Sequence, residues 1–156
     1  MKCVIRILEA RDVKSLASIE KECFESPRSY KSLMADFESP LSFYLVATLE
    51  DGRVAGYIGT QEVCGESNIH NLAVRPAYRR QGIGRALLDK ACEAAKARAC
   101  DFITLEVCAG NIAAINLYKE KGFEIVGKRY DYYAKPREDA LIMTKYFKYS
   151  ASERED

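Results

Sequence analysis

The spacing of apolar residues divides the first part of the chain into one strand and two helices. Residues 3–8 alternate in the manner of a half-buried strand. Asp12 is expected to cap a helix in which apolar residues recur at helical spacing. Those residues are Val13, Leu16, Ile19 and Cys23. Ser26-Pro27 breaks this helix, and a second short helix is predicted over 29–38.

Three strands and two tight turns are predicted next. The strands cover 43–49, 53–63 and 67–74. Asp51-Gly52 is a strong hairpin signal between the first two strands, and Gly65 turns the chain before the third.

The remaining elements alternate between helix and strand. The longest helix carries one apolar stripe, whose members are Ile83, Leu87, Ala91 and Ala95. The elements after it are a strand over 102–107, a helix capped by Asn111 that ends at Lys121 and Gly122, and strands over 123–132 and 140–147. Early hairpins are antiparallel and strand–helix–strand units need crossovers, so the pattern predicts a mixed α/β sheet with a parallel pair in its middle.

Composition is typical of a single globular domain. The 156 residues suit one domain, which we assign to 1–148, followed by a flexible polar tail over 149–156. The net charge of +1, and the absence of an apolar run near ~20 residues, indicate neither a nucleic-acid partner nor a membrane. Six cysteines form no CxxC pair and His70 is the lone histidine. We therefore expect no metal site, and reduced thiols in a cytoplasmic protein.

A segment rich in glycine and arginine enters the longest helix. It runs from Arg79 to Arg85 and holds Gly82 and Gly84, where the backbone can approach a ligand or pack tightly on the sheet. The first turn of a helix presents N–H groups and the positive end of the helix dipole, and the arginines add charge. The segment therefore predicts an anion site of a size for a diphosphate. Leu87 stands where a dinucleotide fingerprint needs glycine, and no P-loop lysine follows.

The segment Arg79-x-x-Gly82-x-Gly84 resembles the acetyl-CoA motif of the GNAT acetyltransferase superfamily. Within it, further residues resemble the ribosomal-protein-alanine N-acetyltransferases (RimI-like) and their archaeal and eukaryotic relatives. These residues are Leu105-Glu106-Val107, Asn111, Ala114-Ile115-x-Leu117-Tyr118, Gly122-Phe123, Tyr132-Tyr133 and Glu138-Asp139-Ala140. The resemblance covers nearly the whole chain. It implies a GNAT fold, with a mostly antiparallel mixed sheet of about seven strands, about four flanking helices, and splayed central strands that bind CoA.

The same resemblance implies which residues hold acetyl-CoA as a cosubstrate. Backbone groups of Leu72, Ala73 and Val74 would pair with the pantetheine arm, with the Val74 N–H toward the thioester oxygen. The diphosphate would be held, mostly through main-chain N–H groups, by Arg80, Gln81, Gly82, Ile83, Gly84 and Arg85, and Arg79 is a further cofactor-binding residue of the motif. Asn111 would bond the pantetheine region, and it can serve as a plain N-cap at the same time.

Acetyl transfer to an amine needs a neutral amine, a stabilised oxyanion and a leaving thiolate that can be protonated. Glu106 is a charged residue in an otherwise apolar strand, so it either faces outward or is functional. Tyr118 lies on a similar helix face to Asn111 and is either a core tyrosine or an acid. The resemblance favours Glu106 as the catalytic base and Tyr118 as the catalytic acid.

Two other residues could carry chemistry. His70 lies next to the cofactor strand and could act as a base. No matched position of the family points to it, so we expect a structural role. Cys108 stands where the RimI-like pattern usually has arginine. A nucleophilic cysteine would allow a two-step route, but the sequence offers it no clear histidine partner.

The acceptor pocket is expected to lie between the first helix–loop–helix and the last strands. Phe24 and Pro27 resemble the family's Phe-x-x-Pro-Trp loop, with Arg28 in place of the tryptophan. Tyr132 and Tyr133 look like the residues that fix a peptide backbone in this family, or they belong to a tyrosine-rich edge strand.

The implied acceptor is the N-terminal α-amine of a protein, with an alanine-starting ribosomal protein as a candidate. The alternatives are a GNAT enzyme for a small amine, polyamine or lysine side chain, and a non-catalytic CoA-binding sensor. A polycation would favour an acidic pocket, whereas the charged residues expected near the pocket, some of them in a polar loop predicted over 134–139, are mixed: Arg28, Lys135 and Arg137 with Glu25, Asp131 and Glu138. A sensor would lack the base or the acid, and both Glu106 and Tyr118 are present. We expect a monomer or a weak dimer.

Overall fold

A computed structural model describes residues 3–134 and 137–147 of the chain, and the predicted tail over 149–156 lies outside them. Seven strands form one sheet in the order β1-β2-β3-β4-β5-β7-β6. The strands are β1 (Cys3–Ile7), β2 (Ser42–Leu49), β3 (Val54–Val63), β4 (Glu66–Val74), β5 (Phe102–Cys108), β6 (Glu124–Ala134) and β7 (Arg137–Tyr146). The helices are α1 (Val13–Cys23), α2 (Tyr30–Glu38), α3 (Ile83–Ala97) and α4 (Ile112–Glu120), with short 3-10 turns η1 (Ala10–Asp12) and η2 (Pro76–Tyr78). The predicted mixed, mostly antiparallel sheet is confirmed, with β4 and β5 as the parallel pair.

The chain divides into two compact units. Unit 1 contains the chain as far as Glu62 together with His70–Glu93, and unit 2 contains Val63–Ile69 together with the chain from Ala94 onward. Strand β4 begins in unit 2 and ends in unit 1. The assignment of one domain to 1–148 stays a prediction.

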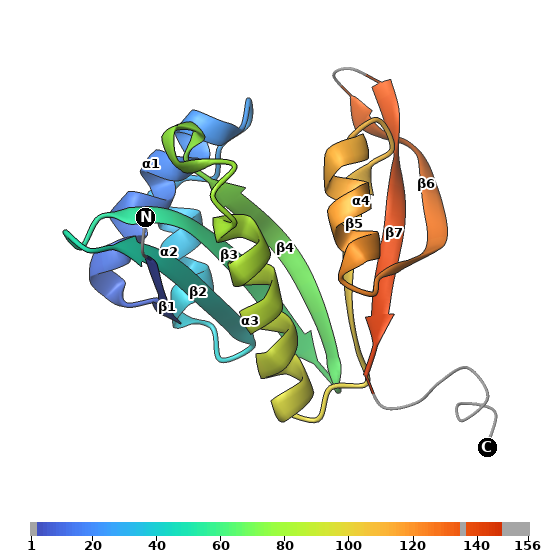
Figure 1. Ribbon diagram of the computed structural model, residues 1–156, viewed down its shortest axis with the longest axis horizontal. Coiled ribbons are helices and arrows are strands. Elements are labelled where there is room, and N and C mark those ends of the chain that lie inside the picture. The colour runs from blue at the N-terminus through green and yellow to red at the C-terminus, as the bar shows by residue number, and fades with distance from the viewer. Residues whose placement is uncertain (1–2, 135–136, 148–156) are drawn as a thin grey trace. The chain divides into compact units, whose positions relative to one another are not determined.

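The core of unit 1 forms on both faces of β2 and β3. Residues of β2 from Tyr44 to Leu49 are all buried, although successive side chains of a strand point to opposite faces. Figure 1 shows α3 on the viewer's side of these strands and α1 and α2 on the far side. The helices α1 and α2 contribute Val13, Leu16, Ile19 and Leu33 to one cluster with Tyr44, Val46 and Tyr57 of the strands. The predicted apolar stripe of α3 is likewise buried, which confirms its helical spacing.

Two tight turns fix the registers in unit 1 and at its border. Cys64 and Gly65 both have positive φ, 51° and 77°, as a two-residue hairpin turn requires. In the other turn Gly52 has a φ of 88°, and the Asp51 carboxylate accepts the Arg53 N–H at 3.0 Å. Both turns had been predicted from the sequence.

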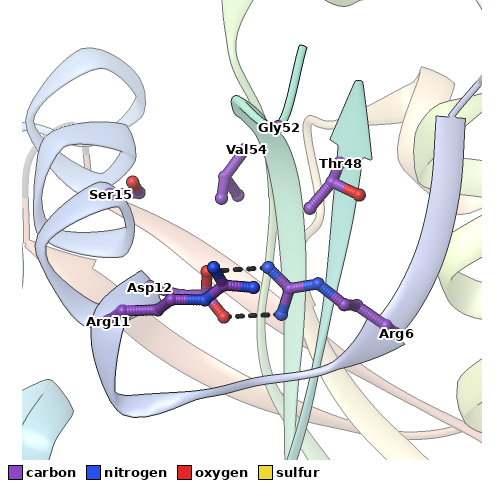
Figure 2. A pocket seen from close by; sticks show the side chains of 7 residues that line it. All are labelled: Arg6, Arg11, Asp12, Ser15, Thr48, Gly52 and Val54. Carbon is purple, nitrogen blue, oxygen red and sulfur yellow. Dashed lines mark hydrogen bonds and ion pairs between the residues drawn. The ribbon is translucent and has the colours of Figure 1, made fainter. Parts of the chain in front are cut away.

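The role predicted for Asp12 is wrong. Asp12 precedes α1, but its side chain makes no hydrogen bond to that helix. Its backbone is already helical because η1 leads directly into α1, whereas a capping side chain needs an extended backbone. The carboxylate instead accepts the Glu9 N–H at 2.8 Å. It also accepts two hydrogen bonds from Arg6 at 2.7 and 2.9 Å (Figure 2). Burial would raise the pKa of Asp12, but these bonds hold it below its ordinary value.

Unit 2 is built on the antiparallel strands β5, β7 and β6, with α4 between β5 and β6 in the chain. Ile103, Leu105 and Val107 alternate along β5 and are buried. The first residues of β4 join this unit through a parallel ladder of three pairs, Glu66–Asn68 with Phe102–Thr104.

The polar loop predicted over 134–139 is wrong. Tyr133 pairs with Glu138 and Ala134 with Arg137, so β6 and β7 continue almost to their connection. The edge strand β6 is open to solvent, so polar side chains there do not indicate a loop. A register shift between Arg129 and Tyr133 interrupts this pairing, and Asp131 takes a φ of 53° within it.

Replacing Gly56 by alanine tests how closely β3 and β4 approach. A Cβ on Gly56 would lie 2.7 Å from the Ala73 carbonyl oxygen, which is main chain and cannot rotate away. We expect Gly56→Ala to lower the free energy of unfolding by about 1–3 kcal/mol in urea denaturation. The matched control is Gly84→Ala, where a Cβ meets only Val74 at 3.7 Å. Equal stability of the two variants would contradict this close approach.

Candidate functional site

The segment that enters α3 has the backbone geometry of an anion site. Gly82 has a φ of 80° and Arg80 a φ of 65°, so the chain turns sharply just before the helix. The intrahelical bonds begin where the Ala86 N–H donates to the Gly82 carbonyl at 3.0 Å. The N–H groups of residues 83–85 therefore precede the helical ladder, at the positive end of the helix dipole.

The two glycines of this segment serve different purposes. Gly82 needs its left-handed backbone, and a Cβ there would meet no atom within 4 Å. A Cβ on Gly84 would make only an ordinary contact with Val74. Tight packing on the sheet therefore does not account for either glycine. The open space at Gly82 and the main-chain donors of the first turn fit the diphosphate of a coenzyme.

Of the arginines predicted at this site, Arg79 is bonded to the sheet. The Arg79 guanidinium turns back to β4 and donates to the Val74 carbonyl at 3.0 Å. The side chains of Arg80 and Arg85 are exposed, as is that of Gln81. Ile83 is buried, so only its main chain can serve a ligand. Arg80 and Arg85 therefore carry positive charge on exposed side chains of the segment that enters α3.

The end of β4 is held firmly within unit 1. Ala73 is buried, whereas Leu72 and Val74 are half-buried. The Val74 carbonyl accepts hydrogen bonds from Arg79 and from the Cys23 thiol, the latter at 3.4 Å. All three residues lie beyond the ladder that joins β4 to β5. His70, for which a structural role was expected, has an exposed side chain.

Glu106 lies on the more open face of β5. Its neighbours Leu105 and Val107 point into the core, and the Glu106 side chain is 28% exposed. Its carboxylate pairs with the Nε of Arg129 at 2.6 Å, and the Arg129 guanidinium lies 5.7 Å from the ring centroid of Tyr132. The predicted base and a predicted acceptor residue are thus joined by one arginine.

Sequence reasoning missed Arg129. No local signal distinguishes it from other charged residues of the edge strand. Only the pairing of β6 with β7, and of β7 with β5, brings Arg129 to the side of Glu106.

The two predicted residues of α4 occupy its start and its last turns. The Asn111 side chain accepts the Ala114 N–H at 3.2 Å, which confirms that it caps the helix. Tyr118 is half-buried, and its ring centroid lies 5.7 Å from that of Phe123. This contact fixes the Tyr118 ring against the turn that ends α4.

The predicted acceptor residues are on the surface. Phe24 and Pro27 are exposed in the loop after α1, and Tyr132 is exposed on β6. Tyr133 pairs with Glu138 through its backbone, and its side chain lies outside what the structure describes. Arg28, which stands where the family has tryptophan, points inward and pairs with Asp36 at 2.9 Å.

Cys108 is unsuited to act as a nucleophile. Burial raises the pKa of its thiol, and the carboxylate of Glu138, to which the thiol donates a hydrogen bond, raises it further. A thiol becomes nucleophilic as the thiolate, which this environment disfavours. The geometry thus opposes a two-step route through Cys108.

A separate pocket of about 410 Å³ lies elsewhere in unit 1 (Figure 2). Its lining residues are Arg6, Arg11, Asp12, Ser15, Thr48, Gly52 and Val54. Its charges are largely paired, Arg6 with Asp12 at 2.7 Å and Arg11 with Glu9 at 2.8 Å. The residues that line it include none of those predicted for the site.

Comparisons with known proteins identify the class of protein. The model of the Acetyltransferase (GNAT) family matches residues 13–123. The chain belongs to the GNAT family of acetyltransferases. It is 38% identical over 142 residues to the [ribosomal protein bS18]-alanine N-acetyltransferase of Escherichia coli K12, covering 89% of this chain and 94% of the relative.

Solved structures give the same fold. The crystal structure of the ribosomal-protein-S18-alanine N-acetyltransferase from Escherichia coli matches with a TM-score of 0.89 and 34% identity, over 96% of this chain and 97% of that one. The Ard1 structure from Thermoplasma volcanium matches with a TM-score of 0.85 and 26% identity, over 96% of this chain and 100% of that one. Of the helices within the described residues, none has the length and apolar character to cross a membrane.

The two glycines of the α3 entrance allow a matched test of the diphosphate site. Alanine at position 82 would have to adopt a φ near 80°, which costs roughly 1–2 kcal/mol, or the main-chain donors would shift. We expect Gly82→Ala to weaken acetyl-CoA binding about tenfold or more in calorimetry, because 1.4 kcal/mol is tenfold. Gly84→Ala should stay within about threefold of wild type, because its Cβ meets only an ordinary contact. Equal binding by both variants would rule out this backbone site.

Proposed function

We propose that the protein transfers the acetyl group of acetyl-CoA to the α-amine of a protein N-terminus, with an alanine-starting ribosomal protein as the acceptor. The observation that carries the proposal is the position of Glu106, which joins through Arg129 to the exposed Tyr132 in a chain of the GNAT family. The relatives named for this activity on ribosomal protein S18 support it, because they match about nine tenths of the chain, 89% in one case.

The donor is held by main-chain groups of unit 1. The N–H groups at the start of α3 bind the diphosphate, with Arg80 and Arg85 adding positive charge. Leu72, Ala73 and Val74 receive the pantetheine arm, and the Val74 N–H polarises the thioester carbonyl. The Arg79 guanidinium donates to the Val74 carbonyl, which belongs to the peptide group that follows this N–H, and so helps to hold the end of β4 in place. Asn111 bonds the pantetheine region while it caps α4.

Glu106 removes the proton from the attacking amine, directly or through water. An N-terminal amine has a pKa of about 7.7–8.0, so at neutral pH a fraction of it is already deprotonated and the base must remove a proton only from the rest. A lysine amine, with a pKa near ~10.4, is almost fully protonated. The ion pair with Arg129 holds the Glu106 carboxylate in one orientation. A single carboxylate base therefore favours an α-amine, which is the easier to deprotonate, over a lysine side chain.

Tyr118 protonates the departing thiolate in the proposed mechanism. Its phenol is held on α4, and the ring contact with Phe123 limits its orientations. The amine attacks the thioester directly, because the environment of Cys108 disfavours a thiolate. Phe24, Pro27 and the two tyrosines, Tyr132 and Tyr133, contact the first residues of the acceptor.

An acceptor panel tests the function. Thiol release is followed with acetyl-CoA and short peptides of different first residues, beside an N-terminally blocked lysine peptide and spermidine. We expect kcat/KM for the alanine-starting peptide to exceed that of the lysine peptide at least about tenfold at pH 7, because the α-amine is less protonated. A preference for spermidine would replace the proposal with a small-amine acetyltransferase. Binding of acetyl-CoA with no transfer to any amine would indicate a sensor.

Two conservative variants test the acid and the base. Glu106→Gln and Tyr118→Phe each remove a proton-transfer group with little change of volume, so we expect each to lower kcat at least about tenfold. Acetyl-CoA affinity, measured separately, should stay near wild type. The matched control is Tyr130→Phe, which removes the hydroxyl of an exposed tyrosine on β6 and should leave kcat unchanged. Wild-type kcat in both Glu106→Gln and Tyr118→Phe would show that the roles are misassigned.

A further inference from the structure

A buried carboxyl group on α1 has no part in the chemistry described above. Glu20 is only 1% exposed, and no ion pair involves it within the described residues. Its oxygens instead accept three hydrogen bonds, from the Arg28 main-chain N–H at 2.9 Å, the Asn71 side-chain amide at 2.8 Å and the Tyr57 hydroxyl. Burying a carboxylate without a cation is costly, and only well-placed donors offset that cost.

The three donors come from parts of unit 1 that are far apart in the sequence. Arg28 directly follows Pro27 of the predicted acceptor loop. Asn71 directly precedes Leu72–Val74, which are assigned to the pantetheine arm. Tyr57 lies on β3, and burial and the bond to Glu20 raise its pKa, so it keeps the proton that it donates. One carboxyl group thus bonds the residue after the acceptor loop and the residue before the donor segment.

Two further contacts join α1 to the end of β4. The Cys23 thiol donates to the Val74 carbonyl at 3.4 Å. Glu22 forms an ion pair with Arg75, which follows β4 directly. The last turns of α1 are therefore bonded at three places to the end of β4 and the residue after it, and of the three α1 residues that make these contacts only Glu20 is buried.

Arg28 is also held by its side chain. The guanidinium donates to the Tyr44 hydroxyl at 2.9 Å and pairs with Asp36. Burial would raise the pKa of Asp36, but hydrogen bonds from Arg28 and Tyr44 hold it below its ordinary value. The Tyr44 ring in turn stacks on Tyr57, with centroids 6.1 Å apart. The residue that replaces the family's tryptophan is therefore used to fix the end of the loop.

We propose that Glu20 is a positioning residue that sets the acceptor loop against the donor strand. The inference rests on the proposed function, because it assigns Phe24–Pro27 to the acceptor and Leu72–Val74 to the donor. Bringing two reactants to within about 3–3.5 Å is a large part of catalysis, and a displacement near 1 Å can cost about a hundredfold. Strand β4 is also bonded to β3, whereas the loop depends on the Arg28 contacts. The acceptor side is therefore the more sensitive to Glu20.

Three substitutions of Glu20 distinguish a role in positioning the acceptor loop from a role in folding stability alone. Glu20→Met keeps the volume but offers no acceptor for the Arg28 N–H, so we expect KM for the alanine-starting peptide to rise at least about tenfold. Glu20→Asp keeps the carboxylate but shortens its reach, and should raise this KM about threefold or more. Glu20→Gln retains one oxygen for the Arg28 N–H, and should restore KM to within about threefold of wild type. Acetyl-CoA affinity should stay within about threefold in all of them.

The matched control is Ile19→Val, at the neighbouring buried position of α1. A loss of stability alone lowers the folded fraction and hence the apparent kcat, but it leaves KM unchanged. Hydrogen exchange gives a second readout that needs no activity. The Arg28 amide should exchange at least about tenfold faster in Glu20→Met than in Ile19→Val, because its acceptor has been removed.

The outcomes distinguish this inference from the proposed function. Peptide KM values within about twofold of wild type in both Glu20→Met and Glu20→Asp would overturn the positioning role. Unchanged exchange of the Arg28 amide in Glu20→Met would overturn it as well, and Glu20→Asp provides the same measurement if the methionine variant does not fold. A wild-type protein that acetylates no peptide α-amine would refute the proposed function. Hydrogen exchange of the Arg28 amide would then still test whether Glu20 holds the loop.

Discussion

The main-chain hydrogen bonding of β4 is the constraint on which the rest of unit 1 depends. Its last residues lie so close to β3 that a Cβ on Gly56 would touch the Ala73 carbonyl. The Val74 carbonyl then meets both α1, through Cys23, and the loop before α3, through Arg79. The strand thereby fixes the positions of the helix that ends at the predicted acceptor loop and of the helix start that presents its N–H groups.

The buried and half-buried carboxylates are stabilised in two ways. Asp12 and Asp36 pair with Arg6 and Arg28, which together with other hydrogen bonds lower the pKa of both acids despite burial. Glu20 has only neutral donors, so the free-energy cost of burying its carboxylate depends on how well its three hydrogen bonds are aligned. A group of that kind is sensitive to small displacements, which suits a role in positioning.

Sequence patterns predicted most elements of the fold and the segments of the site. The stripe from Ile83 to Ala95, the turn at Gly65 and the cap at Asn111 all follow from spacing or from local hydrogen bonding, and the structure confirms them. The failures have physical reasons. Asp12 does not cap α1 because η1 precedes that helix, and the hairpin of β6 and β7 extends through polar residues because an edge strand can be exposed.

The sequence by itself determined the order of the elements, the backbone freedom at Gly82 and the residues that resemble the GNAT motifs. These depend on neighbours along the chain, so periodicity and residue type report them. Only the tertiary structure decided that Arg129 meets Glu106, that Arg79 turns back to Val74 and that Glu20 bonds Arg28, Tyr57 and Asn71. Such contacts join residues distant in the chain, and they follow from strand register and helix packing, which no single stretch of sequence encodes.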